Sequence, residues 1–180
     1  GGQKMIEFKG IYKSYKNKPV LVNANLTIRD NEFFVLIGSS GCGKTTVACA
    51  VLQALISRGL RVGAAKCGPD YIDPMFHSRV IGAKSSNLDS FFFDRDTMRY
   101  LLAHNTQGCD VTVIEGVMGY YDGLGLTTTR ASTWETAQKT ASPTILVVNA
   151  RGAALSVLAA VQGFLQFQPQ SGICGVILNG

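Results

Sequence analysis

The residues best suited to chemistry in this 180-residue sequence lie in one glycine-rich segment, GSSGCGKTT, at positions 38–46. The segment fits the pattern G-x-x-x-x-G-K-[ST], in which glycines let consecutive backbone N–H groups turn inward onto an anion. A helix that follows adds its N-terminal donors and the positive end of its dipole. Lys44 would bring a charge to the β- and γ-phosphates, and Thr45 would offer a hydroxyl group to Mg²⁺. We therefore predict a phosphate loop that binds a nucleotide with Mg²⁺, through Gly38, Ser39, Ser40, Gly41, Cys42, Gly43, Lys44, Thr45 and Thr46.

Acidic residues that follow buried strands are the candidates for further Mg²⁺ ligands, because Mg²⁺ prefers oxygen donors. Glu115 ends the apolar segment DVTVIEG, where an unpaired acid is costly to bury, so we predict a metal ligand there. Asp70 and Asp73 lie in CGPDYIDP after the strand-like LRVGAAK, and the two prolines predict a loop over the phosphates rather than a helix. Because Asp is also common in turns, their spacing leaves a functional role and a turn-forming role open.

The segment GVMGYYDGLG after Glu115 has four glycines in ten residues and predicts a mobile loop near the site. Its Asp122 could contact a substrate or Mg²⁺, or it could simply form a turn. His104 falls late in a predicted helix, where a surface role is favoured. His77 lies nearer to the site and its role is open.

The elements that must position these residues alternate along the chain. Strands are expected at 31–38, 60–66, 110–116, 143–150 and 172–180, and helices at 45–59, 94–108, 132–141 and 153–167. This alternation predicts an α/β P-loop NTPase fold, a mainly parallel sheet with helices on both faces. Before it, residues 6–15 and 19–28 alternate polar and apolar positions around the turn-like KNKP, which predicts an N-terminal antiparallel β-hairpin.

Helix boundaries are marked by local signals. Ser132 and Glu135 fit a capping box, and Asp94 or Asp96 is expected to cap the helix at 94–108. Gly59 suits the left-handed position that follows a helix.

Charge and composition limit the functional classes. Residues 1–29 carry six Lys and Arg against one acid, and residues 30–180 carry eleven of each sign, so the net charge of +5 lies in the first segment. Its lysines alternate with apolar residues, which favours a solvated strand face over a nucleic-acid or membrane partner. No apolar run approaches the roughly 20 residues of a membrane helix. The five cysteines form no C-x-x-C pair, so we expect reduced thiols, no zinc site and a cytoplasmic location.

From Gly41 to Asn179 the chain resembles the ATP-binding domain of the cobyrinic acid a,c-diamide synthases. The similarity rests on SGCGKTTV, KCGPDYIDPMFHSRVIG, NLDSFFFD, VIEGVMGYYDGLG, ARG and GVILN. The resemblance implies a dethiobiotin-synthetase-like fold and an ATP-dependent activation of a corrin carboxylate as an acyl phosphate, which ammonia then attacks. It implies that Thr45, Asp70 and Glu115 gather Mg²⁺ and the phosphates, with Lys44 among the catalytic residues.

The same resemblance assigns the remaining site residues to the substrate and the base. It implies that Asp73 and Asp122 face the corrinoid carboxylate and that Asn179 hydrogen-bonds the adenine.

The first part of the chain resembles a different family. Residues 5–46 look like the start of an ABC transporter ATPase, in which Tyr15 would stack on the adenine. The predicted single P-loop domain, 1–180, would then be a chimera, and a natural domain with a coincidental N-terminal arm is the alternative. The parts of the chimera would be a transporter-like arm and strand at 1–37, a shared phosphate loop at 38–46 and a synthetase-like part at 47–180 that ends after a strand and looks truncated.

Several functions are compatible with these features. We favour a domain that binds ATP and Mg²⁺, with slow hydrolysis at most, over a complete amidoligase, because no glutamine-hydrolysing half is recognised. A folding scaffold with a distorted nucleotide site is the alternative. A transporter ATPase is least favoured, since the sequence has no LSGGQ motif and no Asp-Glu pair at a strand end. Exposed strand edges leave a homodimer open.

Overall fold

The structure is a computed structural model that describes residues 5–15, 18–29, 33–70 and 72–180. In the first two of these ranges it describes the backbone, with side chains at Lys9 and Thr27 only. None of the helices in the described part of the chain is long and apolar enough to cross a membrane.

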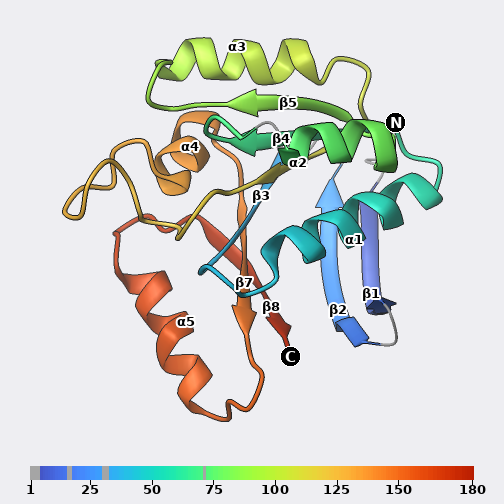
Figure 1. Ribbon diagram of the computed structural model, residues 1–180, viewed down its shortest axis with the longest axis vertical. Helices are drawn as coiled ribbons and strands as arrows, with labels where there is room; N and C mark the ends of the chain where they lie inside the picture. The colour runs from blue at the N-terminus through green and yellow to red at the C-terminus, as the bar shows by residue number, and fades with distance from the viewer. Residues whose placement is uncertain (1–4, 16–17, 30–32, 71) are drawn as a thin grey trace.

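A six-stranded, all-parallel sheet forms the centre of the molecule (Figure 1). Its strand order is β5-β4-β6-β3-β7-β8, and each neighbouring pair runs parallel. The strands are β3 (Phe33–Gly38), β4 (Val62–Cys67), β5 (Lys84–Leu88), β6 (Val111–Glu115), β7 (Thr144–Asn149) and β8 (Ile173–Asn179). The predicted α/β P-loop NTPase-like fold is confirmed. All carboxyl ends of the strands meet at one edge, where such folds bind their ligands.

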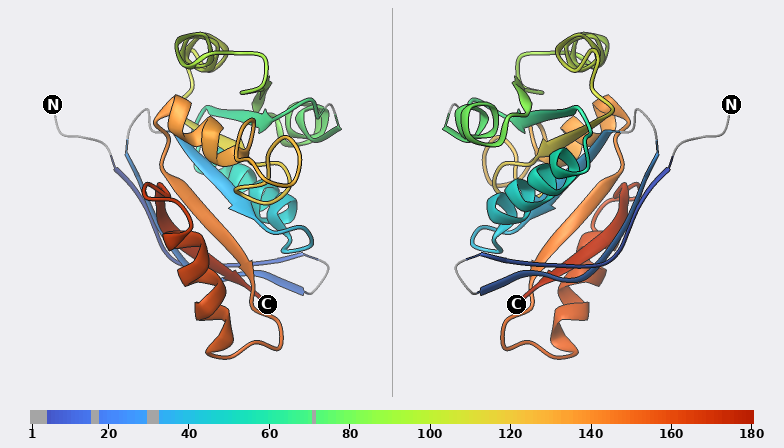
Figure 2. Two further views of the ribbon diagram at one scale, coloured as in Figure 1. Left: turned by 90° about the vertical axis from the view of Figure 1, so that its left-hand side faces the viewer. Right: turned by 90° about the vertical axis from the view of Figure 1, so that its right-hand side faces the viewer.

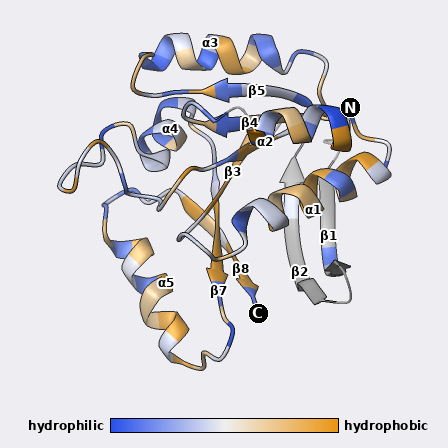
Figure 3. Ribbon diagram, in the orientation of Figure 1, coloured by the Kyte–Doolittle hydropathy of each residue, from blue (hydrophilic) through white to orange (hydrophobic). Residues whose placement is uncertain are grey.

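Helices cover both faces of the sheet because the central strands are apolar on both sides. Phe34 and Leu36 of β3 join the core beneath α1 (Lys44–Ser57), and Val35 and Ile37 join the core on the opposite face. That second face carries α3 (Arg95–Asn105), α4 (Thr133–Thr140) and α5 (Ser156–Gln166). Figure 3 shows the difference between the hydrophobic inner strand β7 and the hydrophilic edge strand β5.

The N-terminal strands β1 (Met5–Tyr15) and β2 (Lys18–Arg29) pair antiparallel in a separate two-stranded sheet. Their register runs from Met5 opposite Arg29 to Tyr15 opposite Lys18, with irregularities between them. The backbone of β2 lies near α1 and β8. Figure 2 shows the pair as a long curved ribbon outside the main sheet.

The predicted helix boundaries agree with the capping geometry. The Asp94 side chain accepts a hydrogen bond from the Thr97 N–H at 2.8 Å, and Ser132 accepts one from the Glu135 N–H at 3.2 Å. Gly59 follows α1 with a φ of 80°, a left-handed conformation that suits glycine.

Two elements differ from the predictions. Asp73 and Pro74 do not lie in a loop: they belong to the short helix α2 (Ile72–Phe76), which continues into the π-helical turn η1 (His77–Ile81). Pro74 is tolerated there because it lies in the first turn, where its missing N–H costs no helical hydrogen bond. The strand β5 was not predicted, because its sequence KSSNL is polar and half-exposed at the edge of the sheet.

Candidate functional site

The phosphate loop connects the end of β3 to the start of α1 and requires its glycines for geometric reasons. Gly41 and Gly43 have φ values of 78° and 81°, in the left-handed region. A Cβ atom on Gly38 would come within 2.6 Å of the Val147 carbonyl oxygen. The loop surrounds one side of a pocket of about 370 Å³, which we call the phosphate pocket. Its other walls are Lys66 and the three residues Gly116, Val117 and Met118.

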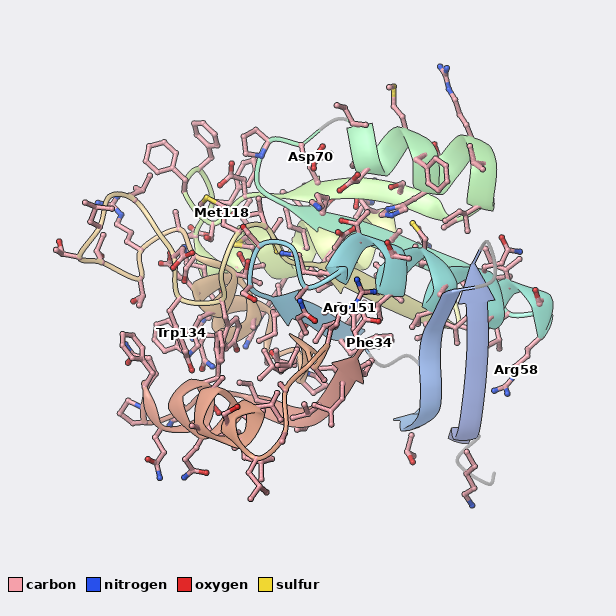
Figure 4. The ribbon with its side chains drawn as sticks, turned by 60° about the horizontal axis from the view of Figure 1, so that its bottom comes forward. Phe34, Arg58, Asp70, Met118, Trp134 and Arg151 are labelled. Atoms are coloured by element: carbon pink, nitrogen blue, oxygen red, sulfur yellow. The ribbon has the colours of Figure 1, made fainter. Side chains whose placement is uncertain are left out.

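Lys44 reaches across this pocket. Its Nζ donates a hydrogen bond to the Met118 carbonyl oxygen at 3.0 Å, so it is held over the space where an anion would bind. Burial, followed by the charge of Lys66, lowers the pKa of Lys44. An incoming phosphate would offer the ammonium group a stronger, charge-assisted partner than a carbonyl. In Figure 4, the loops that carry Asp70 and Met118 flank the phosphate loop.

A buried acid forms the floor of the site at the end of β6. Glu115 is 1% exposed, and its Oε1 accepts hydrogen bonds from the Thr45 hydroxyl at 2.6 Å and from the Lys66 ammonium group at 3.0 Å. The sheet register explains this arrangement, because Lys66 of β4 lies directly opposite Glu115 of β6. The predicted proximity of Thr45 and Glu115 is therefore found in the structure.

Lys66 contacts the two acidic residues, Asp70 and Asp73, that follow β4 in the chain. Its Nζ lies 2.6 Å from Asp73 Oδ2 and 3.6 Å from Asp70 Oδ2. Burial alone would lower the pKa of Lys66, but the hydrogen bond to Asp73 and the charge of Glu115 outweigh it and raise the pKa. Asp70, Asp73 and Glu115 thus converge on one ammonium group beside the phosphate pocket.

Asp70 has the turn-forming role that was considered for it, and its functional role stays a prediction. Its Oδ1 accepts hydrogen bonds from the N–H groups of Ile72 at 3.0 Å and Asp73 at 3.4 Å, as a turn-forming Asp does. Burial opposes ionisation of this carboxyl, but these two hydrogen bonds hold its pKa below the usual range. Asn87 of β5 fixes the loop by donating to the carbonyl groups of Gly68 and Asp70 at 2.9 and 2.6 Å.

Asp122 lies apart from this cluster. Its Oδ2 accepts a hydrogen bond from the Gly119 N–H at 3.0 Å, which is the turn-forming role. It also lines a second hollow of about 650 Å³ between α5 and the loop after β6. We call this hollow the aromatic pocket because Tyr120, Tyr121, Phe164 and Phe167 line it. Ser39 and Ser40 line this pocket and the phosphate pocket alike.

The two residues expected at the base are placed as follows. The Asn179 side chain donates a hydrogen bond from Nδ2 to the Cys42 carbonyl oxygen at 2.8 Å, so in this structure it ties β8 to the phosphate loop. The side chain of Tyr15 lies outside the described part of the chain.

Lys66 and His77 are site residues that sequence reasoning missed or left open. Lys66 is the one charged residue in the otherwise uncharged strand VGAAKC, and this signal could have singled it out. His77 is 1% exposed and packs beneath Glu115, with its Nε2 3.6 Å from Glu115 Oε2. Its position in the acidic segment was visible in the sequence, but its burial was not.

The residues fit a metal ion that arrives on a nucleotide. Among the described residues, no three His, Cys, Asp or Glu side chains are arranged to hold a metal by themselves. Mg²⁺ on a nucleotide takes most of its ligands from phosphate oxygens and water and needs few from the protein. The Thr45 hydroxyl and the buried Glu115 carboxylate beside it supply oxygen donors that suit that requirement.

Comparison with known proteins identifies the family. Residues 33–179 match the CobQ/CobB/MinD/ParA nucleotide binding domain. The chain belongs to this family. It is 46% identical over 150 residues to the cobyrinate a,c-diamide synthase of Listeria monocytogenes, covering 83% of this chain and 33% of that protein. It is 45% identical over 141 residues to the hydrogenobyrinate a,c-diamide synthase of Streptomyces coelicolor, covering 78% of this chain and 29% of that protein.

This family member is a nucleotide-binding domain homologous to the N-terminal third of cobyrinate a,c-diamide synthase. It spans about a third of the length of these relatives. Among solved structures, the signal recognition particle receptor FtsY from Elizabethkingia anophelis aligns with a TM-score of 0.58 at 14% identity. That alignment covers 81% of this chain and 49% of that one, and supports the fold alone.

The N-terminal hairpin lies before the residues that match the family. The comparisons give no support to the predicted transporter likeness of residues 5–46 or to a chimera, and both stay predictions.

Proposed function

We propose that the chain is the ATP- and Mg²⁺-binding domain of an ATP-dependent amidoligase that acts on a corrinoid carboxylate. The observation that carries the proposal is the contact of Thr45 with buried Glu115 beside the phosphate loop, with Lys66 bridging to Asp70 and Asp73. Phosphoryl transfer requires charge neutralisation and positioning more than covalent help from the protein, and these residues are suited to both.

The residues have distinct parts in this proposal. The N–H groups of the phosphate loop and the Lys44 ammonium group hold the phosphates, and Thr45, Asp70 and Glu115 would hold Mg²⁺. When bound, Mg²⁺ supplies neutralisation of the charge on the β- and γ-phosphates. Lys66 contacts all three carboxylates, so its charge offsets their mutual repulsion and holds them in place beside the phosphate pocket.

The acceptor is proposed to approach from the side of Asp73 and Asp122. Support comes from the aromatic pocket, which Asp122 lines and which shares Ser39 and Ser40 with the phosphate pocket. The relatives are named for diamide synthesis on cobyrinate and hydrogenobyrinate. In the complete reaction we propose that the γ-phosphoryl group passes to a corrinoid carboxylate and that ammonia then displaces phosphate.

Calorimetric titration with Mg-ATP tests the binding step. We expect heat of binding for the wild type and none for Lys44→Ala, because that variant loses the cation over the phosphate pocket. Lys84→Ala is the matched control, since Lys84 is an exposed lysine. It is the first residue of the outermost strand β5 and lies away from the carboxyl ends of the strands, where the phosphate pocket is. At a nucleotide concentration of about 100 times the dissociation constant, binding should add roughly 2.7 kcal/mol to the free energy of unfolding. A folded wild-type protein with neither heat nor stabilisation contradicts the proposal and leaves the folding scaffold.

A further inference from the structure

Two buried polar groups face each other behind the phosphate site without a hydrogen bond. His77 is the first residue of η1, and its Nε2 lies 3.6 Å from Oε2 of Glu115. Both residues are 1% exposed. Neither ring nitrogen of His77, nor Oε2 of Glu115, finds a hydrogen-bond partner among the described residues.

The two oxygens of Glu115 are therefore held unequally. Oε1 accepts hydrogen bonds from Thr45 and Lys66, whereas Oε2 faces only the imidazole ring. A buried polar group left without a partner costs on the order of 1–3 kcal/mol, and a charged one costs more. The 3.6 Å separation is just beyond hydrogen-bond length, so a small rotation of either side chain would satisfy both groups.

The two ring nitrogens of His77 differ in what they face. A neutral imidazole has one N–H group to place on either nitrogen, and the tautomer follows the acceptor that is available. Of the two nitrogens, Nε2 is the one that faces an acceptor, and that acceptor is Glu115.

We propose that His77 is a positioning residue that donates a hydrogen bond from Nε2 to Oε2 of Glu115 and so fixes the orientation of this carboxylate toward Thr45 and the nucleotide-bound metal. Thr45 and Lys66 hold one oxygen, and His77 holds the other. His77 is the first residue of a π-helical turn, and such turns are frequent at functional sites. The consequence for metal binding rests on the proposed function, whereas the hydrogen bond itself does not.

Nitrogen NMR of the nucleotide-free protein tests the hydrogen bond directly. The sequence has only two histidines, so His104 serves as an internal reference. We expect Nε2 of His77 to carry a proton, and we expect its signals to shift in Glu115→Gln while those of His104 stay in place. A deprotonated Nε2, or His77 signals that do not respond to Glu115→Gln, overturns the proposal.

Metal dependence of nucleotide binding tests the positioning role. We expect His77→Leu, which fills similar space without a donor, to raise the Mg²⁺ concentration needed for half-maximal ATP binding about 10-fold, the usual effect of losing such a partner. His77→Gln keeps an N–H donor and should restore part of this loss, and His104→Gln should match the wild type. In EDTA the wild type and the three variants should bind ATP with the same affinity, because His77 is proposed to act through the metal. A merely structural role of His77 would instead weaken ATP binding both with and without metal.

The two arms separate the possible failures. Equal Mg²⁺ dependence in His77→Leu and in the wild type overturns the positioning role while leaving the proposed function intact. A wild type that does not bind Mg-ATP contradicts the proposed function, and the NMR result then still decides the hydrogen bond. If His77→Leu does not fold, the NMR arm still decides the hydrogen bond, and the Mg²⁺ dependence of His77→Gln against the wild type decides the positioning role.

Discussion

At the scale of single residues, Lys66 holds the acidic side of the site together. Its ammonium group is almost fully buried and contacts three carboxylates, those of Asp70, Asp73 and Glu115. The removal of one partner from a buried ion pair leaves an uncompensated charge, which is far more costly than the net value of the pair. The free energy of unfolding should therefore depend strongly on Lys66.

Replacement of Lys66 by methionine tests this dependence. We expect Lys66→Met to lower the free energy of unfolding by roughly 3 kcal/mol, because Glu115 and Asp73 lose the cation between them. Urea denaturation at neutral pH measures the change. The double variant Lys66→Met with Asp73→Asn should recover part of the loss, since it removes one of the uncompensated charges. A loss below about 1 kcal/mol, in the range of exposed ion pairs, would show that water already screens the cluster.

At the scale of secondary-structure elements, the segments that follow strong local signals were predictable from the sequence. Ser132 and Glu135 predict the start of α4, and the apolar run through Leu36 predicts β3. The edge strand β5 and the helix α2 were not predictable in this way. The strand β5 exists because β4 offers it a partner, and Pro74 is tolerated because it lies in a first turn. Both conditions are set by tertiary context and not by the local sequence.

The cap of α3 provides a prediction for an element that local sequence does determine. Hydrogen bonding from the Thr97 N–H lowers the pKa of Asp94 in the folded state. A group with a lowered folded-state pKa contributes stability above its unfolded-state pKa and loses it as the pH falls through the folded-state value. We therefore expect Asp94→Ala to melt below the wild type at pH 7 and the difference in Tm to shrink as the pH falls below about 4.

Asp94→Asn is the control for this prediction, because Asn is as good a cap as Asp and has no charge to titrate. Its melting temperature should stay near that of the wild type at pH 7. A gap between Asp94→Ala and the wild type that persists unchanged at pH 2 would assign the effect to something other than the ionised cap.

At the scale of the whole molecule, the order of the strands in the sheet brings residues that are far apart in the sequence into one site. Residues Thr45, Lys66 and Glu115 come from three elements that meet at the carboxyl edge because β4, β6 and β3 are neighbours. Thr45 in the phosphate-loop motif and Glu115 at the end of a buried strand were enough to predict that these two residues meet. The pairing of Lys66 with Glu115 needed the register of β4 against β6, which no local pattern specifies.

Two residues, Tyr15 and Asn179, are the candidates for contact with the base of the nucleotide. The family match begins at residue 33, after the hairpin that carries Tyr15, and it includes Asn179. Asn179 also touches the phosphate loop through the Cys42 carbonyl oxygen, and a Cβ on Gly43 would come within 2.5 Å of its Nδ2. We therefore predict that nucleotide binding depends on Asn179 and not on Tyr15.

Two single substitutions separate these contacts. We expect Asn179→Ala to weaken ATP binding several-fold, by about 1 kcal/mol, because it removes the hydrogen bond that anchors the loop. We expect Tyr15→Ala to bind like the wild type, since the matched nucleotide-binding domain does not include the hairpin. Fluorescence titration with a labelled nucleotide measures both affinities. Base stacking on an aromatic side chain contributes about 1–3 kcal/mol. A loss of that size in Tyr15→Ala, with Asn179→Ala unaffected, would reverse the assignment and support the transporter likeness of the N-terminal segment.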